Sequence, residues 1–338
     1  RAPSSSPEAH EHKLRKTAET VGGWLEVLQS RSLSDQRALD VHLGSRPVPC
    51  MARSHPARLE LDCAAPDEEI DGALKYLAEH PEITDVVISR KDDILTGVSR
   101  TLKVLDRVLD APHVLVARLR SWKLLYSPQA FSVPVLNRLG GRNKLRIVRP
   151  HRLEVETTIL HSSELRPEHA RVVRELRLRG ITVYANTPLL GFINDNAEEL
   201  LRISYACREV GIEYCNVFVT GTPLQRTWNE EHPIDLNSII DIATHVRRFG
   251  SGREVPRYLI RTPLGEVDYS VAPRIFSVSE DRTVAVTLRP HDLDYYRRID
   301  PGFEWPDNAS IDPDGHPTVP LSGVRLDNAD FLAGAPTR

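Results

Sequence analysis

The strongest constraint on the fold is a regular alternation of short apolar strands and amphipathic helices along the middle of the chain. Between Glu68 and Ile260 the pattern repeats five or six times, and Gly180, Gly211 and Gly250 each close a helix shortly before the next strand. Strands that alternate with helices pair in parallel, because each helix returns the chain to the start of the next strand. The pattern therefore predicts an α/β fold, a full or partial (β/α) barrel.

The bounds of the elements follow from hydrophobic periodicity and from glycine and proline breaks. Amphipathic periodicity predicts one helix that opens at Asp67 and ends before His80, and further helices over residues 98–109, 167–180, 197–210 and 237–249. Apolar and β-branched runs predict strands over residues 84–89, 113–117, 145–148, 153–159, 181–184, 214–219 and 258–260. A doubly wound open sheet is the competing arrangement, but no GxGxxG follows an early strand.

The pattern changes on both sides of this region, which divides the chain into three parts. Residues 1–49 are a predicted N-terminal helical extension, and residues 50–270 are the predicted barrel core. Residues 271–338 are polar and rich in proline and aspartate, with one strand expected at 283–288. They predict an irregular C-terminal extension that contacts a partner or a second copy of the chain.

Composition and charge exclude several classes of function. The 44 lysines and arginines against 47 aspartates and glutamates leave a net charge of −3, which excludes nucleic-acid binding through bulk positive charge. No apolar run reaches the ~18 residues of a membrane span and no signal peptide opens the sequence, so we expect a cytoplasmic protein without membrane contact. No GxSxG elbow or Walker loop points to a serine hydrolase or a nucleotidase.

Two arginines stand next to predicted strands, where the functional residues of a barrel gather. Arg118 and Arg261 each follow directly on such a strand. A guanidinium group binds a carboxylate or phosphate through two parallel hydrogen bonds, so both residues predict a site for a small anionic substrate. The alternative is an ordinary ion pair, with Glu266 or Asp268 as the partner of Arg261.

Five short segments, in order along the chain, resemble the lysine 2,3-aminomutase family of radical SAM enzymes. They are residues 76–89 (YLAEHPEITDVVIS), 111–118 (APHVLVAR), 155–164 (VETTILHSSE), 186–195 (NTPLLGFIND) and 251–265 (SGREVPRYLIRTPLG). The resemblance covers residues 66–270 and implies a barrel of the radical SAM type. It also implies S-adenosylmethionine (SAM), a 4Fe–4S cluster and a reductant protein such as a flavodoxin or ferredoxin.

The resemblance also implies residues for the SAM-binding surface. Thr157, His161 and Glu164 match the family's segment at 155–164, and Asp92 stands near the family's Ser-Gly-Gly-Asp. His161 and Glu164 suit a structural hydrogen bond equally well. Asp92 lacks the neighbouring glycines that would let the backbone approach the cofactor closely.

The chain departs from the family in its cysteines. The family holds its cluster with a C-x3-C-x2-C motif, and soft thiolates are what such a cluster requires. Cys50 lies 26 residues before Tyr76, where the resemblance places the last of the three cluster cysteines. Leu43 and Pro47 stand at the other two positions, so Cys50 is the one predicted metal ligand and the other cysteines are expected to be buried thiols.

Two explanations of this departure stay open. Either the chain has lost its cluster, or a segment with the other cysteines and the strand before them is missing from the sequence ahead of Cys50. We favour the second, because losing a whole barrel strand is a larger defect than losing ligands. A second break is expected after Ser89, where Arg90 and Lys91 replace the family's two glycines.

Pyridoxal phosphate, which the family holds on a lysine, is not expected here. No lysine occurs beyond Lys144, and arginine cannot form the imine. The sequence thus predicts an aminomutase-like isomerase of the radical SAM type, which abstracts a hydrogen atom from a small anionic, amino-acid-like substrate for rearrangement, deamination or epimerisation. The alternative is a cluster-free pseudoenzyme that acts as a binding or partner subunit. A homodimer is expected from the C-terminal extension.

Overall fold

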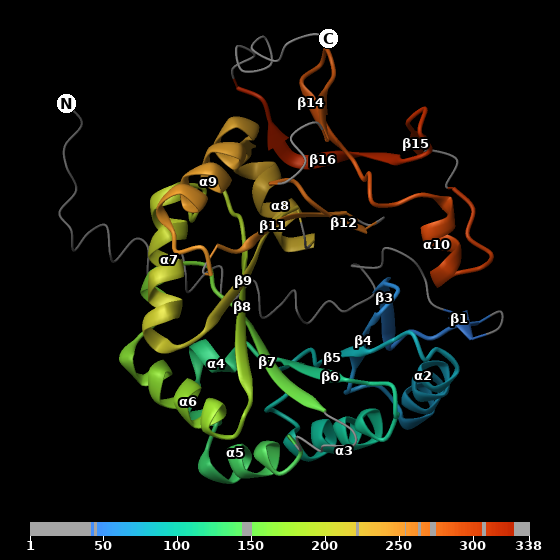
Figure 1. The fold of residues 1–338 in the computed structure, drawn as a ribbon, viewed down its shortest axis with the longest axis vertical. Coiled ribbons are helices and arrows are strands. Elements are labelled where there is room, and N and C mark those ends of the chain that lie inside the picture. Colours follow the sequence, from blue (N-terminus) through green and yellow to red (C-terminus); the bar gives the residue numbers. More distant parts are fainter. Residues whose placement is uncertain are drawn as a thin grey trace.

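The computed structural model describes residues 42–43, 46–143, 151–220, 223–253, 255–262, 265–270, 275–305 and 309–327. Figure 1 shows a strongly curled sheet with helices around its outer face and a second sheet near the C-terminal end. The predicted α/β fold with a partial (β/α) barrel is confirmed. Most of the helical extension predicted for residues 1–49 lies outside the described residues, which begin with the short antiparallel pair β1 (His42–Leu43) and β2 (Arg46–Pro47).

The curled sheet is parallel in its centre and antiparallel at both edges. Its nine strands run in the order β12-β11-β9-β8-β7-β6-β5-β4-β3. The parallel strands are β4 (Arg58–Asp62), β5 (Asp85–Ser89), β6 (Val116–Arg120), β7 (Arg152–Thr158), β8 (Thr182–Pro188), β9 (Glu213–Val219) and β11 (Arg257–Thr262). The antiparallel edge strands are β3 (Met51–His55) and β12 (Gly265–Asp268).

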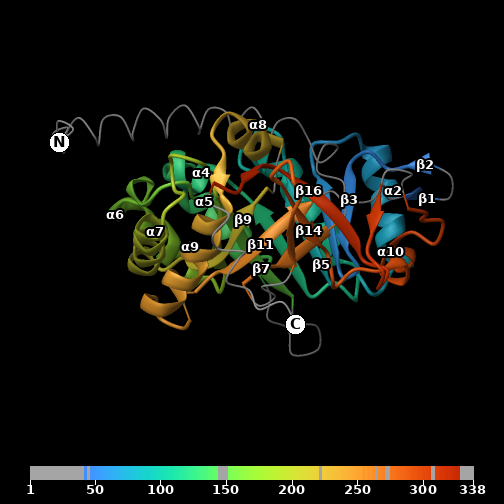
Figure 2. The ribbon, with the colours of Figure 1, turned by 90° about the horizontal axis from the view of Figure 1, so that it is seen from above.

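The long helices follow the curve of the sheet on its outside, as Figures 1 and 2 show for α6, α7 and α9. They are α2 (Asp67–Glu79), α3 (Val98–Leu109), α5 (Val133–Gly140), α6 (Pro167–Leu178), α7 (Ala197–Val210) and α9 (Leu236–Phe249). Shorter helices follow the carboxyl ends of strands: α4 (Lys123–Tyr126), the 3-10 turns η2 (Pro128–Ala130) and η3 (Ser162–Glu164), and α8 (Pro223–Glu231). None of the described helices is long and apolar enough to cross a membrane.

Helix α7 shows how local sequence sets these bounds. The Asn196 side chain accepts a hydrogen bond from the Glu199 backbone and begins the helix, and Gly211 ends it with a φ of 85°. Asn is a favoured N-cap and glycine adopts the left-handed conformation without steric cost. Leu200 and Ile203 are buried against the sheet. Both α3 and α7 have the bounds that periodicity predicted.

One predicted strand is displaced along the chain. The strand expected at 113–117 spans Val116–Arg120 instead, because residues 111–114 form a turn before the backbone bonds to the Thr84 carbonyl, directly ahead of β5. Arg118 consequently lies in the middle of β6 rather than at its end, which corrects the sequence expectation. The strand predicted at 145–148 lies outside the described residues.

The first parallel strand, β4, was not predicted, and its presence corrects the argument for a missing segment. We expected the strand that precedes the cluster loop to lie ahead of Cys50, but β4 follows Cys50 as the second strand of the β3–β4 hairpin. The backbone passes from Val48 to Met51 through a turn closed by a 3.2 Å hydrogen bond between these residues. A barrel strand is therefore not lacking before α2.

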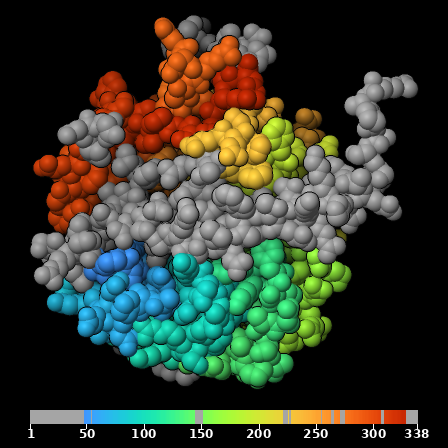
Figure 3. Space-filling model, turned by 180° about the vertical axis from the view of Figure 1, so that it is seen from behind, coloured from blue at the N-terminus to red at the C-terminus, as the bar shows by residue number. Residues whose placement is uncertain are grey.

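The C-terminal extension is more regular than the sequence indicated. The expected strand is confirmed as β14 (Thr283–Thr287), and it belongs to a sheet ordered β10-β16-β14-β13, with β15 paired to β16. The further elements are β10 (Ile234–Asp235), β13 (Phe276–Val278), α10 (Leu293–Ile299), β15 (Ser310–Ile311) and β16 (Pro317–Arg325). In Figure 3 this extension, orange to red, lies on the opposite side of the molecule from the first half of the barrel.

Candidate functional site

Backbone strain marks the carboxyl edge of the curled sheet. Among the described residues other than glycine, four have positive φ, and three of them follow barrel strands: Asp93 (74°) after β5, Phe192 (63°) after β8 and Thr220 (55°) after β9. A left-handed conformation is costly for residues with a side chain, and such strain gathers at functional sites. This edge is therefore the candidate site on grounds independent of any family.

Two of the strained loops are fixed by buried polar side chains. Asp93 is fully buried and its carboxylate accepts hydrogen bonds from Ser121 Oγ (2.8 Å), Leu95 N (2.8 Å) and Lys123 N (3.1 Å). Burial raises the pKa of Asp93 above its usual range. Asn194 fixes the loop after β8 in the same way. Its side-chain amide donates to the carbonyls of Leu160 (2.9 Å) and Pro188 (3.0 Å), and its Oδ1 accepts from Leu190 N at 2.7 Å.

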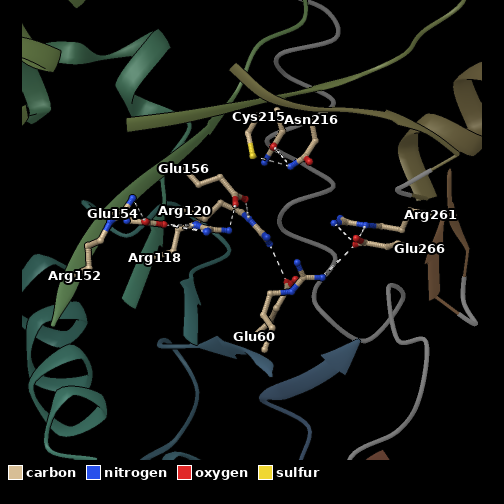
Figure 4. Close-up of polar contacts among 12 residues, drawn as sticks. Glu60, Arg118, Arg120, Arg152, Glu154, Glu156, Cys215, Asn216, Arg261 and Glu266 are labelled. Atoms are coloured by element: carbon tan, nitrogen blue, oxygen red, sulfur yellow. Dashed lines mark hydrogen bonds and ion pairs between the residues drawn. The ribbon is translucent and has the colours of Figure 1, made fainter. Parts of the chain in front are cut away.

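The concave face of the sheet is lined by charge, because β6 and β7 alternate apolar residues toward the helices with charged residues toward the interior. Arg118 lies 2.9 Å from Glu154 and 3.5 Å from Glu156, and Arg120 lies 2.8 Å from Glu156. Arg120 also reaches Glu60 on β4 at 3.1 Å. Figure 4 shows these side chains turned toward one another across the interior.

A second part of the network bridges the open seam between the two ends of the curled sheet. Glu266 on β12 accepts hydrogen bonds from Arg261 Nε on β11, at 2.7 Å, and from Arg58 on β4, at 3.2 Å, and it is ion-paired with Arg261 Nη2 at 2.6 Å. The Arg261 guanidinium also lies over the Phe218 ring, 4.1 Å from its centroid. Arg58 and Glu266 are 208 residues apart in sequence, so this pair joins the first parallel strand to the last hairpin.

Ion pairs within the network lower the pKa of three of its carboxyl groups, those of Glu60, Glu156 and Glu266. Its members are five arginines and four glutamates: Arg58, Arg118, Arg120, Arg152, Arg261, Glu60, Glu154, Glu156 and Glu266. Burial by itself would raise the pKa of Glu156, but Arg120 and Arg118 outweigh it and lower that pKa to about 2. Burial would likewise raise the pKa of Glu266, but Arg261 and Arg58 outweigh it and lower that pKa to about 2.

A β-bulge adds two polar side chains to this interior. The pairing of β8 with β9 shifts register so that Ala185 faces Tyr214 and Asn186 faces Asn216, which leaves Cys215 as the extra residue. Asn216 Nδ2 donates to Asn186 Oδ1 at 2.8 Å, and Figure 4 shows Cys215 and Asn216 on the same side as the charged network. Bulges often redirect side chains next to functional sites.

Both predicted substrate arginines lie on the concave face. Arg118 and Arg261 are each close enough to Glu156 to lower its pKa, so the fold brings them into one interior. Each is ion-paired, and Glu266 is the partner of Arg261 that the sequence offered as the alternative. An external anion that binds either arginine would compete with these carboxylates for the same guanidinium.

The four residues predicted for SAM do not converge on that interior. Asp92 is ion-paired with its neighbour Arg90 at 2.5 Å. Thr157 is buried and lies on the side of β7 opposite Glu156, toward the helices. His161 and Glu164 form a capping box around η3, in which the Glu164 carboxylate accepts from the His161 backbone at 3.3 Å.

His161 also faces a buried acid, which gives it a second structural contact. Its Nε2 lies 3.3 Å from Glu199 Oε1 on α7. Glu164 in turn accepts a 2.7 Å hydrogen bond from the Tyr126 hydroxyl, and burial raises its pKa. These contacts tie the loop after β7 to α4 and α7, so the SAM role of the four residues stays a prediction.

The four cysteines do not fit a cluster held by three thiolates. Cys50 is buried, its Sγ donates to the Glu69 carbonyl at 3.4 Å, and burial with the nearby Glu69 carboxylate raises its pKa to about 12. Cys63 follows β4 directly, but it is buried beside Thr101 and burial raises its pKa as well. A cluster needs deprotonated thiols that lie together. No group of three histidine, cysteine, aspartate or glutamate side chains in the described part of the chain suits a metal ion.

Most of the network was not predicted from the sequence. Glu60, Glu154, Glu156 and Arg120 were not singled out, although Arg118-x-Arg120 and Glu154-x-Glu156 carry opposite charges at the same two-residue spacing. In a strand this spacing places both charges on one face. Matching charge pairs on consecutive strands would have indicated an ion-paired barrel interior.

Comparison with known proteins confirms the resemblance to lysine 2,3-aminomutases. No family model matches the chain. An L-lysine 2,3-aminomutase of Fusobacterium nucleatum is 24% identical over 224 residues, which are 66% of this chain and 50% of that protein. A glutamate 2,3-aminomutase of Clostridioides difficile is 22% identical over 200 residues, 58% of this chain and 44% of that protein. The chain thus spans about half the length of the curated relatives it matches.

Among solved structures, a radical SAM methyltransferase from Sphaerobacter thermophilus matches with a TM-score of 0.37 and 14% identity. The match covers 60% of this chain and 59% of the methyltransferase.

Proposed function

We propose that this protein is an aminomutase-like barrel that binds a small anionic, amino-acid-like substrate on its concave face. The observation that carries the proposal is the placement of Arg118 and Arg261 on one interior, where both lower the pKa of Glu156 and where the Arg261 carbonyl accepts a hydrogen bond from the strained residue Thr220. The similarity to relatives named as lysine and glutamate 2,3-aminomutases supports amino-acid chemistry. Arg118 and Arg261 would hold the carboxylate of the substrate by paired hydrogen bonds.

Binding can be tested directly by titration calorimetry with L-glutamate and L-lysine as probes. We expect L-glutamate to bind, and Arg118→Lys and Arg261→Lys to weaken it about tenfold, because lysine keeps the charge but loses the two-pronged contact. Arg253→Lys is the matched control, since Arg253 pairs with Glu213 away from the interior. Equal affinity in all three variants would reject the proposed site.

The proposal extends to catalysis, with a reaction of the radical SAM type on the bound substrate. This reaction would consist of hydrogen abstraction from the bound substrate, with rearrangement, deamination or epimerisation as the outcome and without pyridoxal phosphate. Sequence similarity to aminomutases supports it. The cysteines of this chain do not supply three clustered thiolates, so no step through a cluster follows from the structure.

A cluster-free barrel that acts as a binding or partner subunit is the second candidate function. It is favoured by one observation, the separate burial of Cys50 and Cys63. Anaerobic reconstitution with iron and sulfide, followed by iron analysis, decides between the two. Stoichiometric iron that is lost in Cys50→Ala supports the radical enzyme, whereas iron-free protein that still binds L-glutamate supports the binding subunit.

A further inference from the structure

We infer that Glu266 occupies the anion subsite of the concave face, as a carboxylate supplied by the protein itself. A carboxylate or phosphate group of a ligand binds Arg261 and Arg58 only after the Glu266 side chain has turned away. This inference rests on the proposed function, because it concerns regulation of the same interior.

The contacts of Glu266 are those that a bound anion would make. Its Oε1 accepts hydrogen bonds from Arg261 Nε at 2.7 Å and from Arg58 Nη2 at 3.2 Å, and it is ion-paired with Arg261 Nη2 at 2.6 Å. The two arginines come from β11 and β4, at opposite sides of the seam. Two guanidinium groups that converge on one carboxylate oxygen form a strong anion subsite.

Arg261 keeps its position when the carboxylate leaves. Its guanidinium lies over Phe218 at 4.1 Å from the ring centroid, and stacking on an aromatic face orients the planar group. The Arg261 backbone is fixed by the pairing of β11 with β12, and its carbonyl accepts from Thr220 Oγ1 at 3.4 Å. The subsite therefore exists before a ligand arrives.

Glu266 is easier to displace than the carboxylates on Arg118. Arg118 contacts both Glu154 and Glu156, which lie on β7 in the middle of the sheet. Glu266 lies on β12, the last strand of the sheet, which has a neighbour on one side only. Its side chain is 16% exposed and that of Arg261 is 20% exposed, so a ligand from solvent can reach the pair.

The movement is a rotation of the side chain, because the backbone of β12 is held in place. Gly265 has a φ of 134°, and a Cβ there would lie 2.4 Å from Cε1 of His291. Thr262 Oγ1 donates to the Gly265 carbonyl at 3.1 Å, which fixes the hairpin from the other strand. Glu266 can leave Arg261 while its own backbone stays paired with β11.

Substitution Glu266→Gln tests the inference, with succinate and inorganic phosphate as separate probes in titration calorimetry. We expect at least one probe to bind Glu266→Gln at least tenfold more tightly than the unmodified chain, since the competing charge is gone. The preferred probe tells a carboxylate subsite from a phosphate subsite. Glu213→Gln is the matched control, because Glu213 pairs with Arg253 outside the interior. This variant should bind succinate and phosphate with the affinity of the unmodified chain.

The double variant Glu266→Gln with Arg261→Ala should return to weak binding. If the unmodified chain binds L-glutamate but Glu266→Gln binds neither probe more tightly, the inference is overturned and the proposed function stands. If neither protein binds any of these anions, both fail. Glu266→Asp gives a second test, because it keeps the negative charge but moves the carboxylate one methylene further from Arg261. Phosphate or succinate should raise the Tm of this variant more than the Tm of the unmodified chain. An equal rise in both proteins contradicts the inference.

Discussion

At the scale of single residues, the cysteines differ most in accessibility. Cys50, Cys63 and Cys207 are buried, whereas Cys215 is partly exposed on the bulge of β9. Burial raises the pKa of all four thiols, so access to solvent decides their relative reactivity.

We therefore expect iodoacetamide to alkylate Cys215 first in the native protein. Cys50 and Cys207 should react only after unfolding, because reagent cannot reach them in the folded chain. Peptide mapping by mass spectrometry over a time course measures this order. Native labelling of Cys50 as fast as that of Cys215 would show that the Cys50 thiol is open to solvent, and would restore it as a candidate cluster ligand.

The buried ion pairs give a second residue-level prediction. Glu156→Gln should lower the free energy of unfolding by about 3 kcal/mol, because Arg118 and Arg120 lose the charge that offsets their burial. Urea denaturation measures the change. Glu213→Gln, at an exposed pair, should change it by less than about 0.5 kcal/mol. Equal effects at the two sites would contradict the energetic role of the network.

Two arginines of the candidate site could be identified from the sequence, but the ion-pair network they belong to could not. Arg118 and Arg261 were recognisable because each adjoins an apolar strand, and Glu266 was named as one partner. The partnership with Glu154 and Glu156 depends on the register of β6 against β7, which pairs Arg118 with Glu154. Register is a property of the assembled sheet, so the local pattern does not contain it.

At the scale of elements, the loop after β8 at the carboxyl edge is fixed by hydrogen bonds and by one close backbone contact. Gly191 lies in the loop after β8, and its N–H donates to Asn229 Oδ1 at 3.1 Å while Trp228 Nε1 donates to its carbonyl at 2.9 Å. A Cβ on Gly191 would lie 2.1 Å from the His232 carbonyl oxygen. This contact, rather than a special φ, is why glycine is needed there.

Gly191→Ala should therefore destabilise the protein by about 2 kcal/mol, since either the loop or the end of α8 must shift. Gly252→Ala is the matched control, because no atom lies within 4 Å of a Cβ at that position. Its effect should stay within about 0.5 kcal/mol. Thermal or urea unfolding compares the two, and equal losses would show that the loop after β8 yields without cost.

Long helices were predicted well and the first hairpin was not. Helices α3 and α7 carry clear apolar periodicity over three turns, which is a local signal. Strand β4 reads Arg-Leu-Glu-Leu-Asp, and its alternating charges are typical of a solvated strand. They face the barrel interior instead, where Arg58 and Glu60 have partners from distant strands, so tertiary pairing overrides the local pattern.

At the scale of the whole molecule, the network makes stability depend on pH. The pKa values of Glu156 and Glu266 are lowered from 4.5 to about 2 in the folded state. A lowered carboxyl pKa contributes stability that is fully present above the unfolded value, and that is lost as pH falls through the folded value. His291 acts in the same direction at higher pH, since burial lowers its pKa from 6.5 to about 4 and the unfolded chain takes up the proton first.

We expect the free energy of unfolding to decrease below about pH 6.5, by about 3 kcal/mol through His291, and more steeply below about pH 4.5, where Glu156 and Glu266 titrate together. Each glutamate should contribute about 3 kcal/mol over the steep range. Urea unfolding from about pH 7 to about pH 3 measures the curve. Glu156→Gln should flatten its steep part, and a flat curve in the unmodified chain would mean that these carboxylates are not held as ion pairs.

The seam pair has a consequence for how the protein is made. Arg58 and Glu266 are separated by 208 residues, so the contact that joins the two ends of the curled sheet cannot form until the last barrel hairpin has left the ribosome. At typical synthesis rates of about 5–20 residues per second, that interval lasts about 10–40 s. Throughout it the nascent barrel is an open sheet whose charged lining faces water. The charged side chains that are costly to bury in the finished interior thus make the exposed face of the unfinished sheet polar. Nascent chains therefore present no apolar surface there on which they could aggregate.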